Sequence, residues 1–438
     1  MPAGSLHGRP PVRRDGAEGS LRTSLGGLTT RGRSFLAAGT ASAVCAFVLG
    51  QADLLRVGLL LAALPLVCVL VLHRTRYRVS ASRRLSPAQV PARSEAGVHL
   101  RIDNVSRIPS GLLMLQDRVP YVLGPRPRFV LDRLEPGGRR EVSYRVRSEL
   151  RGRYSLGPLQ LRLTDPFGMC ELIRSFSARD TLTVVPRVEP LPPVRLSGTA
   201  GGYGDRRQRA LALAGDDDVI PRGYRHGDDL RRVHWRSTAR HGELMVRREE
   251  QPQRVRCTVL LDTRRAAYTG SGPGSPFEWA VSGAASVGMH LLERGFSVRL
   301  LTDAGMPAGS PDGGGFDSDS AEVAAALLDA LAVIEQSEAG GLAHAYDVMR
   351  GGAGGGAREG LLIAFLGALD PDEASLLARM RQRTHRALAF TAQNGGGEGS
   401  SQAALREAGW TVVPGGPGAE LARLWQEAHE GLGEGLKR

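Results

Sequence analysis

The sequence predicts a two-helix transmembrane hairpin, then a small β-sandwich-like domain, and then an α/β domain built on a mostly parallel sheet. Two apolar stretches lie close together near the N-terminus, at 35–50 and 54–73. Short runs with apolar residues at every second position follow, up to about residue 190. Strand-like and helix-like segments then alternate from residue 254 onward. Period-two alternation indicates half-buried strands, and strand–helix repetition is typical of a parallel sheet covered by helices.

Each of the two apolar stretches is near the roughly 20 residues that a helix needs to span a bilayer. Arginines flank the pair on its outer sides: Arg22, Arg31 and Arg33 before it, and Arg74, Arg76 and Arg78 after it. Basic residues favour the cytosolic side, so we expect a multi-pass protein of the plasma membrane with both termini and all soluble domains cytosolic. A cleaved signal peptide and a buried hairpin of a soluble protein are the alternatives, although the stretch before the first apolar run is long for a signal peptide.

Changes in composition give the expected domain boundaries. We expect a disordered basic tail over 1–34, the hairpin over 35–73, a β-rich domain over 74–190, a linker over 191–220, a distinct segment over 221–250 and the α/β domain over 251–435. The net charge is +12, and its arginine excess lies in the front part of the chain. Membrane lipid explains that charge better than nucleic acid does, because aromatic residues for base stacking make up only 5% of the chain. We therefore expect no nucleic-acid partner.

Individual elements follow from the same patterns. Strands are expected in the β-rich domain at 98–103, 140–148 and 181–186. In the α/β domain, strands are expected at 254–262, 297–303, 360–369, 386–393 and 410–414, and helices at 276–295, 321–334, 370–384, 404–409 and 419–429. Asp370 is expected to cap its helix, because Pro371 follows it at the position where proline is best tolerated.

The densest functional signal is PRGYRHGDDLRRVHWRSTARHGELMVRREE at 221–250. Asp228 is a good N-cap, so we expect a helix to begin there and to run to Arg240. Such a helix places Arg231 one turn from Trp235, where a guanidinium can stack on the indole ring.

Three uses of this segment remain open from the residues alone. It can be a latch between domains with Trp235 buried, a docking surface for a partner protein, or a catalytic segment that uses Asp228, His234 and Arg240. The histidines of the segment, His226, His234 and His241, are about two helical turns apart, which is too far for one metal ion on a continuous helix.

Two stretches resemble the family called "domain of unknown function 58". One is the run of Tyr224, Gly227, Asp228, Arg231, Trp235, Ala239 and Arg240, and the other is RGRYSLGPLQLRLTDPFG at 151–168. The resemblance implies a von Willebrand factor A-like, Rossmann-like domain attached to a membrane hairpin. It also implies two partners, a MoxR-type AAA+ ATPase and a transglutaminase-like membrane protein.

Together these observations predict a non-catalytic, membrane-anchored scaffold or adaptor that docks a MoxR-type ATPase or a client protein. No P-loop, nucleophile elbow or H-E-x-x-H motif is present in the sequence, so we expect neither an enzyme nor a cofactor. The alternatives are a hydrolase-type enzyme and a basic module that binds anionic lipid.

Domains of the von Willebrand factor A type often bind Mg²⁺ through a D-x-S-x-S loop, because that ion prefers oxygen ligands. Here Asp262 begins the corresponding loop, but Arg264 and Ala266 replace the two serines. Asp303 and Asp370 lie at the ends of other strands, where ligands usually bind in open α/β sheets. The three carboxylates either gather at that edge or are neutralised by Arg264. We expect a degenerate site without a tightly bound metal.

Overall fold

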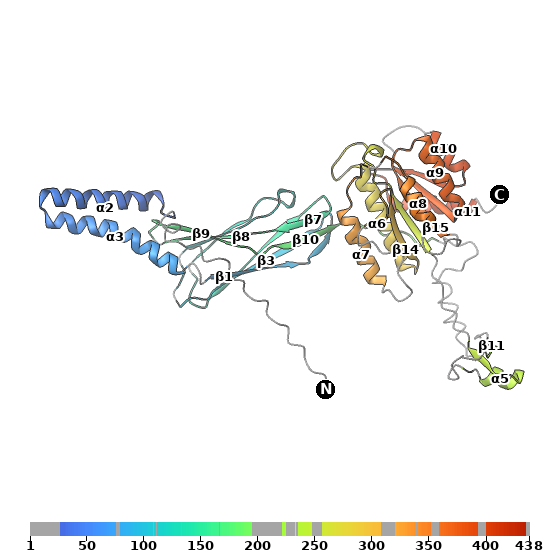
Figure 1. Cartoon of the computed structure of the whole chain (residues 1–438), viewed down its shortest axis with the longest axis horizontal. Coiled ribbons are helices and arrows are strands. Elements are labelled where there is room, and N and C mark those ends of the chain that lie inside the picture. Colours follow the sequence, from blue (N-terminus) through green and yellow to red (C-terminus); the bar gives the residue numbers. More distant parts are fainter. Residues whose placement is uncertain are drawn as a thin grey trace. The chain divides into compact units, whose positions relative to one another are not determined.

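The computed structural model (Figure 1) divides the chain into two compact units. It describes residues 27–75, 79–194 except 108, 111, 133 and 166, 221–224, 233, 235–247, 256–307, 320–338, 340–351, 359–392 and 400–434. Unit 1 comprises residues 1–88, 95–147 and 154–182, and unit 2 comprises residues 89–94, 148–153 and 183–438. Unit 2 therefore includes two short stretches that lie far upstream of most of its residues.

The two apolar helices of unit 1 are α2 (Thr30–Leu49) and α3 (Ala52–Thr75), and both are long and apolar enough to cross a membrane. The first begins at Thr30, earlier than expected. The two helices lie side by side (Figure 1) and approach closely at two glycines. A Cβ on Gly39 would lie 2.7 Å from the backbone nitrogen of Ala62, and a Cβ on Gly58 would lie 2.8 Å from that of Ala43. Only glycine permits this backbone approach, which is also found in closely packed helix pairs of membrane proteins.

Strands form the rest of unit 1. The strands of one antiparallel sheet, in the order β1-β3-β6, are β1 (Val79–Ser86), β3 (Glu95–Asn104) and β6 (Arg139–Arg147). Those of the other, in the order β5-β4-β8-β9, are β4 (Leu112–Asp117), β5 (Arg128–Leu131), β8 (Leu159–Thr164) and β9 (Glu171–Phe176). Alternate residues of β3 and β8 are buried, which confirms the period-two interpretation.

Three further strands lie in or next to the stretches that belong to unit 2. They are β2 (Gln89–Pro91), β7 (Gly152–Leu156) and β10 (Asp180–Val185). β2 pairs in parallel with the end of β10, from Gln89 opposite Thr183 to Pro91 opposite Val185. The strands expected at 98–103, 140–148 and 181–186 are thus found as β3, β6 and β10.

The C-terminal part of unit 2 is an α/β domain with a five-stranded parallel sheet in the order β14-β13-β15-β16-β17. Its strands are β13 (Arg256–Leu261), β14 (Ser297–Thr302), β15 (Glu359–Leu366), β16 (Thr384–Ala392) and β17 (Thr411–Gly415). Its helices are α6 (Pro276–Glu293), α7 (Ser320–Val333), α8 (Ala343–Gly351), α9 (Pro371–Gln382), α10 (Ser400–Glu407) and α11 (Leu421–Glu434). Each expected strand and helix of this domain is present, whereas α8 was not predicted.

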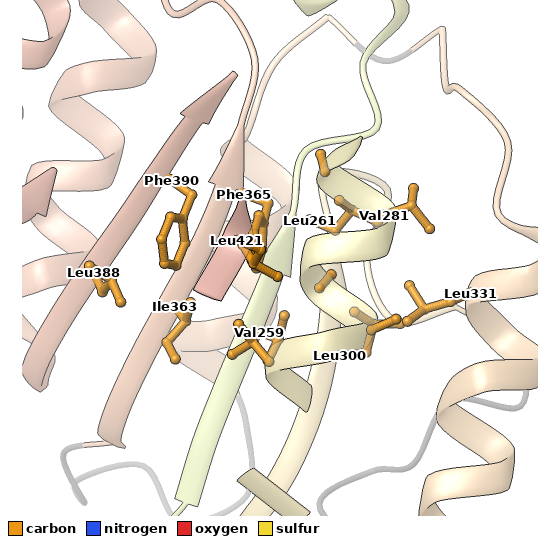
Figure 2. Close-up of a cluster of buried hydrophobic side chains, with 14 of the residues drawn as sticks. Val259, Leu261, Val281, Leu300, Leu331, Ile363, Phe365, Leu388, Phe390 and Leu421 are labelled. Atoms are coloured by element: carbon orange, nitrogen blue, oxygen red, sulfur yellow. The ribbon is translucent and has the colours of Figure 1, made fainter. Parts of the chain in front are cut away.

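Helices cover both faces of this sheet. Side chains of α6, α7 and α11 pack on one face, where Phe365 and Phe390 stack at 5.0 Å between ring centroids (Figure 2). Side chains of α8, α9 and α10 pack on the other face, against Leu362 and Ala364 among others. The central strand β15 is buried on both faces, which explains its unbroken apolar sequence.

Candidate functional site

The carboxyl ends of the parallel strands form the first candidate site. The chain runs from β13 to β14 on one side of the sheet and from β15 to β16 on the other, so the strand order reverses between the neighbours β13 and β15. Ligands of open α/β sheets bind at such a switch point. Asp262 follows β13 directly, Asp303 follows β14, and the segment from Gly367 to Asp370 follows β15.

Asp262 is fully buried at this switch point, and its carboxylate is held by the chain itself. The Arg264 guanidinium donates to both of its oxygens, from Nε at 2.9 Å and from Nη2 at 2.8 Å. The backbone amides of Arg264 and Gly367 also donate to it, at 3.1 and 3.2 Å. The carboxylate therefore has a cation and four donors without any ligand from outside the protein.

A second acidic side chain completes the pairing of Arg264. Glu373, in the first turn of α9, forms an ion pair with the same guanidinium, and the side chains of Arg264 and Glu373 are only 6% and 4% exposed. The guanidinium also donates to the carbonyl oxygen of Ala368 at 3.2 Å. Buried charges are tolerated when they are paired and hydrogen-bonded. Arg264 thus lies between two buried carboxylates at the position where a metal ion would otherwise be sought.

The other predicted carboxylates have separate partners. Asp303 is buried and accepts hydrogen bonds from the backbone nitrogen and hydroxyl of Thr263, both at 2.6 Å, and from the hydroxyl of Ser337. Asp370 accepts from the backbone nitrogen of Glu373 at 2.8 Å and caps α9, as expected. Among the described residues, Arg264 is paired with Asp262 and Glu373, and Asp303 and Asp370 are held by other donors.

Tyr268 supports the loop that carries Arg264. Its hydroxyl donates to the backbone oxygen of Asp262 at 2.9 Å. Burial, together with the nearby Asp262 carboxylate, raises the pKa of Tyr268 well above its usual range. The phenol therefore stays protonated as a donor at physiological pH. Ala266, in contrast, lies exposed in a short 3₁₀ turn (Arg265–Ala267) and contributes no polar group.

In the described part of the chain, no group of three or more His, Cys, Asp or Glu side chains is arranged to hold a metal ion. The carboxylate that sequence reasoning missed is Glu373. The sequence does contain a signal for this residue. Glu373 follows the Asp370 cap by three residues, and a glutamate at that position completes a capping box. In this chain that glutamate has the second role of pairing with Arg264.

The 221–250 segment is the second candidate site. It contains the antiparallel pair β11 (Pro221–Gly223) and β12 (Met245–Arg247), with the short helix α5 (Trp235–His241) between them. The expected helix from Asp228 to Arg240 is wrong at Val233, while residues 228–232 and 234 lie outside the described part of the chain. Val233 forms a β-bridge with Val246 instead, so that the helix begins only at Trp235.

Short contacts hold this small ββα arrangement together. The hydroxyl of Thr238 accepts from the backbone nitrogen of Met245 at 3.1 Å, and the backbone nitrogen of Tyr224 donates to Leu244 at 2.8 Å. Val233 and Val246 are its buried apolar residues. These two valines thus pack against each other inside the segment, whereas Leu244 is 41% exposed.

The outer side of α5 carries the residues singled out in the sequence. Trp235 is 71% exposed, and Ala239 and Arg240 are also exposed. Trp235 and Ala239 lie four residues apart and so share one helix face. Within the segment itself Trp235 is therefore not buried, and the latch between domains stays a prediction. Gly227, Asp228, Arg231 and His234 lie outside the described residues, and so does His226, so their predicted roles remain predictions.

Arg151, the first residue of the 151–168 stretch, is a site residue whose role the sequence did not indicate. Its guanidinium pairs with Glu278 of α6 and lies 5.1 Å from the ring centroid of Phe277. It also donates to the backbone oxygens of Leu331, at 2.9 Å, and Ile334. These carbonyls end α7, where a helix has unpaired acceptors and partial negative charge. Arg151 therefore caps α7 with a buried positive charge.

Beside Arg151 lies a cavity of about 480 Å³ within unit 2. Its charged lining residues are Arg93, Arg151, Arg187, Glu149, Glu189, Glu278 and Glu420. Both signs of charge are present around it, so the lining does not select an anionic or a cationic ligand. Trp279 provides its aromatic wall.

Comparison with known proteins supports the family resemblance. Residues 221–394 match the model of the family described as "Protein of unknown function DUF58". The match includes the 221–250 segment and the α/β domain as far as β16. No curated protein is similar enough to match the chain.

Two solved structures are similar to parts of the chain. A crystal structure of the SpRpn10 VWA domain is 12% identical, with 40% of this chain and 95% of that chain covered and a TM-score of 0.28. A crystal structure of the CARDB domain of the PF1109 protein from Pyrococcus furiosus, in complex with di-metal ions, is 13% identical, with 24% of this chain and 87% of that chain covered and a TM-score of 0.19. At these TM-scores neither similarity indicates a function for this protein.

Proposed function

We propose that this protein is a non-catalytic adaptor, anchored in the membrane by α2 and α3, whose 221–247 segment docks a partner protein. The observation that carries the proposal is the exposed Trp235, with Ala239 and Arg240 beside it on α5. Tryptophan and arginine are the residues that most often dominate the binding energy of protein interfaces. An indole ring that is exposed to solvent does not stabilise the packing of the segment that contains it.

The carboxyl edge of the sheet supports a docking role over a catalytic one. Asp262 and Glu373 are both paired with Arg264 and buried. General acid–base catalysis requires a group that reaches the substrate and exchanges protons with it, and these two carboxylates are occupied. In this proposal the α/β domain, which we regard as von Willebrand factor A-like, serves as the rigid body that presents α5.

The partner we propose is a MoxR-type AAA+ ATPase, with a transglutaminase-like membrane protein as a second one. Arg31 and Arg33 lie exposed at the start of α2, and the positive-inside tendency favours a cytosolic position for them. We therefore propose a multi-pass protein of the plasma membrane that holds its partners at the cytosolic face.

Affinity purification of the full-length protein from its native membranes, in mild detergent, tests the proposal. We expect a AAA+ ATPase to co-purify with the parent, and its recovery to fall tenfold or more with the Trp235→Ala, Arg240→Ala double variant, because hot-spot residues contribute about 2 kcal/mol or more. Mass spectrometry identifies and quantifies the partner. Tyr121→Ala is the matched control, since Tyr121 is an exposed ring of unit 1.

Two outcomes would contradict the proposal. If the ATPase enriches equally with parent and double variant, and both unfold at the same temperature, α5 is not the docking surface. If no protein enriches with the parent over an unrelated membrane protein, the adaptor role itself fails.

A further inference from the structure

The DPFG end of the 151–168 stretch is attached to the first turn of α2. The backbone nitrogen of Thr29 donates to the carbonyl oxygen of Met169 at 2.9 Å, and the Thr29 hydroxyl donates to that of Gly168 at 2.7 Å. The backbone nitrogen of Glu171 donates to the oxygen of Gly27 at 2.8 Å. These bonds fix the loop at the point where the first apolar helix begins.

The second apolar helix passes the same loop. Cys68 is buried close to the Asp165 carboxylate, and the next helix residues that are buried are Val69 and Leu72. Leu70 and Val71, on the other side of that turn, are 62% and 53% exposed. At the level of the loop, α3 therefore still presents apolar side chains outward.

Helix length places the loop relative to a bilayer. α2 has 20 residues, which at 1.5 Å per residue is about 30 Å, the thickness of the hydrocarbon layer. With the tight turn at Gly50 on one side, the hydrocarbon boundary on the other side falls in the first turn of α2, with the side chains of Arg31 and Arg33 extended toward the headgroups. The apolar window of α3 runs from Ala52 to Leu72 and ends at the same level. The loop bound to Thr29 is thus at the boundary, and not beyond the headgroups.

Among the described residues of this loop, Phe167 has a largely exposed aromatic side chain. Its side chain is 59% exposed, although its backbone is held by the Asp165 carboxylate, which accepts from the nitrogens of Phe167 at 3.1 Å and Cys170 at 2.6 Å. Gly168 has φ +67° and lies next to the Arg31 guanidinium. The loop thus presents an exposed aromatic ring with a cation close by.

We propose that the DPFG loop is a membrane-interface anchor, in which Phe167 inserts its ring among the lipid chains and Arg31 meets the lipid phosphates. Aromatic rings favour the interface, and arginines near helix ends extend to the headgroups. The occupant of this surface is lipid, because the apolar side chains of Leu70 and Val71 lie at the same level. The inference rests on the proposed membrane span of α2 and α3.

Depth-dependent fluorescence quenching tests this inference on the full-length protein in vesicles of mixed neutral and anionic phospholipid without other proteins. Three variants each add one tryptophan: Phe167→Trp in the loop, Phe47→Trp within α2, and Tyr121→Trp as the control. Phe47 and Tyr121 are both about nine-tenths exposed. The added emission is the difference between each variant and the parent, measured in lipids with and without brominated chains.

We expect brominated lipid to reduce the added emission of Phe167→Trp about twofold or more, as for a ring at the interface, and to leave that of Tyr121→Trp unchanged. Phe47→Trp should be quenched as well, because α2 spans the bilayer in the proposed function. If Phe47→Trp is quenched and Phe167→Trp is not, the anchor is wrong and the span stands. If Phe47→Trp is not quenched, the span itself is wrong and the anchor falls with it.

Discussion

Replacing Arg264 with alanine is expected to lower the Tm of the α/β domain by about 10 °C. The change leaves two buried carboxylates, those of Asp262 and Glu373, without their cation. Removing one partner of a buried ion pair costs about 3–5 kcal/mol, and a domain of this size loses roughly 3 °C per kcal/mol. Trp410 and Trp425 are buried in this domain, so tryptophan emission during heating of the full-length protein reports its unfolding.

The neighbouring arginine provides the matched control. Arg265 pairs with Glu338 on the surface, where the two side chains are 66% and 77% exposed. Such pairs contribute about 0–1 kcal/mol, so Arg265→Ala should hardly change the Tm. Adding Asp262→Asn and Glu373→Gln to Arg264→Ala should recover part of the loss, because no buried charge then remains unpaired. Equal Tm values for Arg264→Ala and Arg265→Ala would disprove the buried-cation interpretation.

Arg151→Ala is expected to reduce the unfolding free energy of unit 2 by about 3 kcal/mol, a loss typical of a buried charge that is removed from its partners. The variant loses the ion pair with Glu278 and leaves the carbonyls of Leu331 and Ile334 without their donor. Urea unfolding of the full-length protein in detergent, followed by tryptophan emission, measures the change.

Two companion variants separate the charge from its geometry. Arg151→Lys keeps the charge but lacks the planar fork that serves several acceptors, so we expect it to lose more than half of what alanine loses. Arg153→Ala removes an exposed arginine of the same stretch and should behave like the parent. An unchanged midpoint for Arg151→Ala would show that the guanidinium does not cap α7.

Sequence reasoning was most successful where one pattern decides an element alone. The apolar runs predicted α2 and α3, and the alternation of β- and α-type segments predicted the parallel sheet, because burial on one or both faces imposes a periodicity on the residues. It missed α8, whose nine residues form a short helix between glycine-rich stretches that are typical of loops. It also placed the start of the helix in the 221–250 segment too early, since the pairing of Val233 with Val246 is a contact between residues distant in sequence.

The sites were only half predictable for the same reason. Asp262, Arg264 and the Asp370 cap follow from local order along the chain. The roles of Glu373 and Arg151 do not, because each depends on which side chain the fold brings opposite it. Arg151 reaches carbonyls at Leu331 and Ile334, and no local pattern in residues 151–154 points to that distant helix end. The exposure of Trp235 also needed a structure, since burial and docking predict the same residue type.

The position of Arg151 in the chain also has a consequence for how the protein is made. The carbonyls that it caps lie 180 and 183 residues further along. At the usual rates of synthesis, roughly ten to forty seconds pass between the two. During that interval the strands of unit 1 have all been made, whereas Arg151 and the 89–94 stretch have no α/β domain to join. Unit 2 can therefore be completed only after the α/β domain has been synthesised, and its two upstream stretches, 89–94 and 148–153, pack against that domain at the end.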